Sequence, residues 1–281
     1  MRRTIKYLSI LLLIICLTAC GKGDNGGINL LPTKKLKASD LSISDFEWNT
    51  DASKCYGNDC YIFSLKNNSK YDIVGFQFKY SVKDDVPTSD LDIYDDFMKD
   101  HDGYIEEDDS PRYVTLNTGA VDVLLSQGES KEGTTLRIGY RDWTWYSYPN
   151  DKQFELMEPN ELQVGIIYEK KLYLAYYSFL NKSWKLDAKT GVADEWTNKE
   201  IGKKLPKTNG KHFIVIVDED DYYNIGVYGI TKELYNEYID ELVKQNYEKG
   251  EYDRYKKDGY TIDLYYNEDM ETLDLSIKKD N

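Results

Sequence analysis

An acidic segment, residues 84–109, holds the side chains best suited to bind a metal ion. Asp100, Asp102 and Asp109 occupy the third, fifth and twelfth positions of a twelve-residue stretch, a spacing at which carboxylates wrap around Ca²⁺. Met98 occupies the first position, however, and a thioether does not suit this hard cation. We therefore expect an acidic, solvated loop without a cofactor, and Ca²⁺ at these three aspartates is the alternative.

A run of aromatic residues is the second candidate for a binding site: Trp143, Trp145, Tyr146 and Tyr148. Rings at alternate positions of a β-strand share one face, so they would form a platform on which a sugar or a peptide stacks. The same pattern is typical of a strand with one face in the core, the more common place for large rings. We expect the core position, and the ligand-binding face is the alternative.

Cys55 and Cys60 are separated by Tyr-Gly-Asn-Asp, which is a turn-forming sequence. Outside the cytoplasm, such a close pair is typical of a structural disulfide. A metal site would need further Cys or His ligands nearby, and redox-active pairs are separated by two residues instead of four. We therefore expect a disulfide that closes a hairpin.

The first twenty residues predict export and a lipid anchor. Three basic residues precede an apolar run, Leu8–Leu17, as in a secretory signal, and this run is too short for a transmembrane helix of roughly twenty residues. The Leu-Thr-Ala that precedes Cys20 resembles the lipobox of bacterial lipoproteins. That resemblance implies cleavage after residue 19 and attachment of lipid, including palmitate, to Cys20. An ordinary signal peptide that contains a cysteine by chance is the alternative.

The lipobox resemblance also implies a location and a first division of the chain. Residues 1–19 would be the signal peptide, and residues 20–39, rich in Gly and Lys, would form a lipidated, flexible tether. The protein would then lie on the outer, extracytoplasmic face of the cell membrane. Its partner there would be the membrane itself, reached through the lipid.

Charge and motif content restrict the function. The formal net charge is −14, and removal of residues 1–19 takes away three positive charges, which leaves −14 − 3 = −17. Nucleic acid repels such a chain. Only two histidines occur, and the chain has no nucleophile elbow, zinc-protease motif or phosphate loop. We expect a non-catalytic protein that binds an envelope protein or a glycan; a carboxylate-based hydrolase is the less favoured alternative.

Residues 40–187 have the pattern of a mainly β, antiparallel domain. Apolar and polar residues alternate with a period of two in segments 76–83 and 162–168. Further strands are expected at 61–66, 113–116, 121–125, 134–140, 154–157 and 172–180. The strand rhythm of YIFSLKNNSKYDIVGFQFKYSVKD and the hairpin ELQVGIIYEKKLYLAYYS resembles the immunoglobulin-like, FxLYD-related domains of lipoproteins from Gram-positive bacteria. The resemblance implies an immunoglobulin-like antiparallel β-sandwich.

Residues 195–281 follow a linker expected near 188–193, and their pattern is different. Two strands, an amphipathic helix that begins after Thr231 and three more strands predict a small α+β domain, ββαβββ, with one helix on an antiparallel sheet. Trp196 and the Leu-Pro pair at 205–206 resemble a small C-terminal domain of unknown function found on bacterial lipoproteins. That resemblance brings no catalytic residues with it.

Overall fold

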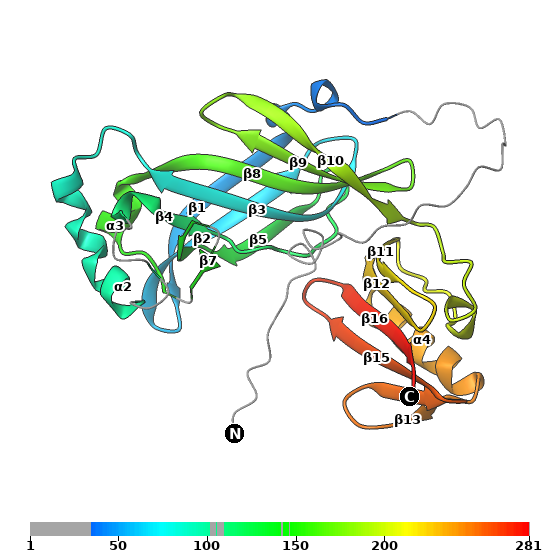
Figure 1. Ribbon diagram of the computed structural model, residues 1–281. Helices are drawn as coiled ribbons and strands as arrows, with labels where there is room; N and C mark the ends of the chain where they lie inside the picture. The colour runs from blue at the N-terminus through cyan, green and yellow to red at the C-terminus, as the bar shows by residue number, and fades with distance from the viewer. Residues whose placement is uncertain (1–34, 102–104, 106–109, 142, 146, 281) are drawn as a thin grey trace.

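The computed structural model describes residues 35–101, 105, 110–141, 143–145 and 147–280. These residues form two antiparallel sheets (Figure 1). One sheet has the strand order β1-β2-β5, and the other has the order β13-β14-β15-β16-β12-β11-β10-β9-β8-β3-β4-β6-β7. The mainly β, antiparallel class expected from the sequence is therefore confirmed.

The elements have the following bounds. The strands are β1 (Phe46–Cys55), β2 (Asn58–Asn67), β3 (Asp72–Val82), β4 (Val114–Asn117), β5 (Ser130–Thr135), β6 (Arg137–Tyr140), β7 (Trp143–Thr144), β8 (Met157–Tyr168), β9 (Lys171–Ser178), β10 (Ser183–Ala193), β11 (His212–Asp218), β12 (Tyr222–Tyr228), β13 (Glu248–Lys249), β14 (Arg254–Lys257), β15 (Tyr260–Asn267) and β16 (Thr272–Lys279). The α-helices are α2 (Asp95–Asp100), α3 (Asp151–Glu155) and α4 (Lys232–Lys244), and the 3-10 helices are η1 (Ala38–Asp40), η2 (Ile43–Asp45), η3 (Thr88–Tyr94), η4 (Pro111–Tyr113) and η5 (Gly202–Lys204). No helix among the described residues is long and apolar enough to span a membrane.

In the N-terminal part, residues 35–187, the small sheet packs against part of the large sheet. Phe63 of β2 is fully buried and lies on Phe78 of β3, with ring centroids 4.5 Å apart. Trp48 of β1 contacts the same Phe78 ring at 5.7 Å. Phe76 and Tyr80, which the period-two pattern puts on the same face as Phe78, lie in this core too.

The β1–β2 hairpin turns within two residues, Tyr56 and Gly57. Both have positive φ values, 51° and 86°, as a type I′ turn requires. The Cys55–Cys60 disulfide lies beside this turn, with the two Cα atoms 5.8 Å apart. The expected disulfide at a hairpin is therefore confirmed.

The first half of the acidic segment is not the solvated loop that we expected. It folds into η3 and α2, and apolar residues spaced three apart point inward between the carboxylates. Leu91, Tyr94 and Phe97 are buried in the N-terminal core, and the Tyr94 hydroxyl donates a hydrogen bond of 2.8 Å to the carbonyl of Gln153. The high density of Asp residues conceals this short apolar repeat in the sequence.

Two of the expected strands are also absent. Residues 121–125 form only isolated bridges to β3. Residues 154–157 span the end of α3 and the start of β8. Asn150 and Gln153 explain the helix, because the side chain of each accepts a hydrogen bond of 3.0 Å from the backbone N–H of the other. This reciprocal pair is a capping box, which starts a helix.

The C-terminal part, residues 195–280, consists of β11 to β16 with α4 packed on the sheet (Figure 1). Tyr235 and Tyr238 of α4 are buried in its core, which is separate from the N-terminal core. Thr231 caps α4 as expected, because its side chain accepts a hydrogen bond from the N–H of Leu234. The element order is ββαββββ and not ββαβββ, because the two-residue strand β13 is too short to leave a pattern in the sequence.

A continuous strand joins the two parts where we expected a linker. β10 runs through residues 188–193 and pairs with β9 along most of its length. Val192 and Ala193, at its end, pair with β11. A register shift within β10 interrupts the alternation that would have marked it as a strand. The large sheet therefore passes from one part to the other where β10 lies beside β11 (Figure 1), through a ladder of two residue pairs.

Candidate functional site at the junction of the two parts

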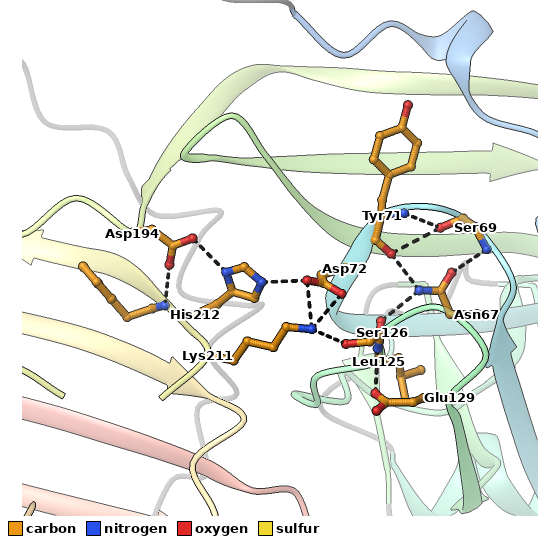
Figure 2. Close-up of polar contacts among 11 residues, drawn as sticks. Asn67, Ser69, Tyr71, Asp72, Leu125, Ser126, Glu129, Asp194, Lys211 and His212 are labelled. Carbon is orange, nitrogen blue, oxygen red and sulfur yellow. Dashed lines mark hydrogen bonds and ion pairs between the residues drawn. The ribbon is translucent and has the colours of Figure 1, made fainter. Parts of the chain in front are cut away.

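Four polar residues meet where the two parts touch: Asp72, Asp194, Lys211 and His212, named here the junction cluster (Figure 2). His212 Nε2 lies 2.8 Å from Asp72 Oδ2, and His212 Nδ1 lies 2.7 Å from Asp194 Oδ2. Lys211 Nζ contacts the Asp72 carboxylate at 3.2 Å. One imidazole ring therefore bridges a carboxylate of β3 and a carboxylate that follows β10.

A buried amide fixes the start of β3 and with it Asp72. Asn67 is fully buried, and its side-chain N–H groups donate to the carbonyls of Tyr71 and Leu125, both at 2.8 Å (Figure 2). Its side-chain oxygen accepts a hydrogen bond of 3.0 Å from the N–H of Ser69. These three bonds shape the turn between β2 and β3, so Asp72 enters the junction in a fixed position.

Asp194 and Lys211 are also held by more than one contact. Asp194 has a positive φ of 53°, and its Oδ1 accepts a hydrogen bond of 2.9 Å from the backbone N–H of Phe213. Lys211 Nζ reaches the hydroxyl of Ser126, at 2.6 Å, in addition to Asp72. Each charge in the junction cluster thus has at least two partners, as partly buried charges require.

The electrostatics of the cluster favour the charged form of His212. The side chain is 16% exposed, and the hydrogen bond that its ring donates to Asp194 raises the pKa of His212, an effect that outweighs the lowering by burial. Asp72 adds to the rise. For Asp72, burial acts to raise the pKa, but hydrogen bonds from His212, Ser126 and Lys211 overcome it and lower the pKa. The raised pKa of His212 and the lowered pKa of Asp72 are consistent, because both shifts favour the charged ion pair between these two side chains.

A surface hollow of about 370 Å³ opens beside the junction cluster. Its walls include His212, both cluster aspartates and the turns that precede β3 and join β8 to β9. Tyr71 and Tyr168 meet edge to face there, with ring centroids 5.6 Å apart, and Lys70 Nζ lies 5.2 Å from the Tyr71 ring centroid. The hollow therefore combines aromatic walls with charges of both signs.

The junction cluster holds the two parts together and does not have the arrangement of a catalytic site. A general base needs a ring nitrogen free to take a proton from a substrate, and both nitrogens of His212 are bonded to carboxylates. The two carboxylates contact opposite sides of the ring, so they cannot share one metal ion with it. This geometry instead provides a salt bridge between the two parts of the chain.

The aromatic run is divided between the core and the surface. Trp143 is 68% exposed on the edge strand β7, and its ring is nearly parallel to that of half-buried Trp145, with centroids 6.4 Å apart. Trp145 packs against the N-terminal core and against His101, at 4.3 Å. Tyr148 is half-buried, and Tyr146 lies outside the described residues. The expected core position thus fits Trp145 but not Trp143.

The other predicted site residues are described only in part. Asp100 ends α2, whereas Asp102 and Asp109 lie outside the described residues, as does Cys20. In the part of the chain that the structure describes, no three His, Cys, Asp or Glu side chains are grouped to hold a metal ion. The Ca²⁺ alternative and the lipidation of Cys20 therefore stay predictions.

Sequence reasoning missed the junction cluster. Asp72 and His212 are 140 residues apart, and neither belongs to a motif. The one available signal was the rarity of histidine, with two in the chain and one at the start of a strand. That signal does not identify the carboxylates that the histidine contacts.

Comparisons with known proteins found no match for this chain among family models, curated proteins or solved structures.

Proposed function

We propose that the protein is a lipoprotein of the cell envelope, anchored by a lipid on Cys20 outside the cytoplasm, and that it binds an envelope protein or a glycan without catalysing a reaction. In this proposal the N-terminal part is an immunoglobulin-like β-sandwich. The C-terminal part is a small α+β domain, and residues 20–39 are the tether.

The Cys55–Cys60 disulfide is the observation that carries the proposal. Disulfides persist in oxidising compartments and are rare in the reducing cytoplasm. The cationic and apolar N-terminus with its lipobox-like Leu-Thr-Ala-Cys20 gives a route to such a compartment. Both ring nitrogens of His212 are bonded to carboxylates, which supports a role without catalysis. The strongly negative net charge argues against nucleic acid as the binding partner.

Replacement of the lipidated cysteine tests the anchor. The Cys20→Ala variant should lose labelling by a fatty-acid analogue, and it should be released from the membrane or keep its signal peptide. Cys16→Ala is the matched control, because this cysteine lies in the apolar run and should leave labelling unchanged. Full labelling of Cys20→Ala would overturn the proposal.

Capture of a sugar or peptide at the aromatic edge is a second candidate, favoured by the exposed ring of Trp143. A flat ring that stacks on a neighbouring indole offers an apolar face to a sugar ring. Tyr113 is 51% exposed, and the guanidinium of Arg141 lies 5.0 Å from the centroid of its ring. This cation–π pair lies near the same edge of the sheet.

Sedimentation with purified cell-wall glycan tests this candidate. The Trp143→Ala variant should bind about tenfold more weakly than the unmodified chain, as expected for loss of an aromatic anchor. The matched control is Tyr252→Ala, which removes a ring that is 91% exposed on the C-terminal part. Equal binding by both variants, or no binding by the unmodified chain, would rule out glycan capture at the aromatic edge.

A further inference from the structure

His212 contacts Asp194, which directly precedes the C-terminal part, and Asp72 of the N-terminal part. Asp194 Oδ1 is bonded to Phe213, the residue next to His212, so this carboxylate is fixed beside the ring. Asp72 belongs to the first position of β3, on the other side of the junction (Figure 2). The Nε2–Asp72 bond therefore crosses between the parts, whereas the bond from Phe213 keeps Asp194 attached to the C-terminal part.

We propose that His212 is a proton-controlled latch: in its protonated form it holds the C-terminal part against the N-terminal part through Asp72, and loss of the proton loosens that contact. This inference goes beyond the proposed function and does not depend on the lipid anchor. An extracytoplasmic location would expose the latch to changes in external pH.

The number of protons on the ring decides the state of the latch. An imidazolium ring donates from both nitrogens, and a neutral ring donates from one and presents a lone pair on the other. Both nitrogens of His212 face carboxylate oxygens at 2.7 and 2.8 Å, so the observed geometry needs the imidazolium form. In the neutral ring, one nitrogen lone pair would face an anionic oxygen.

The bond to Asp72 is the one expected to fail. Asp194 stays close to Nδ1 because Phe213 holds it, so the neutral ring should keep its proton on Nδ1. The lone pair of Nε2 would then point at Asp72, which repels it. Asp72 retains Lys211 as a partner and so needs no second proton donor.

The surroundings allow the contact to loosen without separating the parts. Other titratable groups at the hollow are Lys70, Tyr71, Tyr168, Glu169 and Lys170, and Lys211 lies on the β11 side. Burial of the ring opposes its protonation, but the two bonded carboxylates, Asp194 first, overcome this effect and raise the pKa of His212. The β10–β11 ladder and an apolar cluster that includes Val74 and Ile214 continue across the junction and would act as a pivot.

Hydrogen exchange of the full mature chain across pH, corrected for the intrinsic rate, tests the latch. We expect amides at the start of β3 and in β11 to lose about tenfold protection as His212 loses its proton, whereas amides of the β15–β16 pair keep theirs. Imidazole ¹⁵N spectra follow the protonation of His212 directly. The chain has two histidines, so the signals of His212 are separated from those of His101 by comparison with the His101→Gln variant.

Three variants separate the latch from other effects of pH. His212→Gln should abolish the pH dependence of the junction, and His101→Gln should preserve it. Asp72→Asn should keep the junction protected at high pH, because its amide can donate to the neutral ring. Titration of His212 without a change in junction protection, or a pH response that survives in His212→Gln, would overturn the proposal. If His212→Gln does not fold, the ¹⁵N titration and Asp72→Asn still decide the question.

Discussion

Asn67 shows how one buried side chain positions a distant contact. Its amide makes three hydrogen bonds inside the N-terminal part and exposes none of its surface. Two of the groups that it satisfies are the carbonyls of Tyr71 and Leu125, which have a buried partner in place of water. Asp72 follows Tyr71 directly, so its position in the junction cluster depends on this amide.

Replacement of Asn67 by alanine should lower the free energy of unfolding by about 2–4 kcal/mol, because it removes three buried hydrogen bonds that contribute about 0.5–1.5 kcal/mol each. Chemical denaturation measures this change. Asn68→Ala is the control: its amide donates to Glu47 at the surface, and its loss should cost less than about 1 kcal/mol. Equal losses for the two variants would mean that the buried amide does not hold the turn.

At the scale of elements, the hairpin of β1 and β2 is held by its turn, its ladder and the disulfide. Tyr56 is 95% exposed, so the tip of the hairpin has few packing contacts to replace the covalent link. The Cys55–Cys60 bond should therefore contribute mainly by restricting the unfolded chain.

Removal of the disulfide should lower the free energy of unfolding by about 2 kcal/mol, the value for a short loop on the chain-entropy model. Reduction should add two daltons to the mass and make both thiols reactive, whereas the oxidised chain should not react. The Cys55→Ser, Cys60→Ser double variant should match the reduced chain in stability. Equal stability before and after reduction would contradict this account.

Regular elements could be predicted from the sequence where one physical signal dominated. The alternation in β3 and β8 and the Thr231 cap of α4 are local patterns, and the structure confirms them. η3 and α2 were missed because Asp residues separate their buried apolar residues. β10 was missed because its register shift breaks the alternation.

At the scale of the whole molecule, the two parts have separate cores and share one sheet. The junction cluster lies beside the ladder between β10 and β11, which consists of two residue pairs. Because so short a ladder joins the two parts, a polar contact beside it has a large influence on their relative orientation. The cluster could not be predicted, because contacts between residues 140 positions apart leave no periodic signal in one sequence.

The stability that His212 contributes should depend on pH in a defined direction. The folded-state pKa is raised, so the contribution should be complete below about 6.5, the ordinary pKa of histidine, and be lost as pH rises through the raised value. The difference in melting temperature between the unmodified chain and His212→Gln should therefore be largest near pH 6 and shrink at higher pH. His101→Gln should show no such trend, and a difference that grows with pH would have the wrong sign.

The location of the protein is the claim on which the proposed function rests, and intact mass spectrometry of the protein extracted from cell membranes tests it most directly. We predict a mature chain that begins at Cys20, lacks residues 1–19 and carries the added mass of a diacylglyceryl group on that cysteine. An N-terminal peptide that begins elsewhere, or a chain that begins at Cys20 without lipid, would contradict the account.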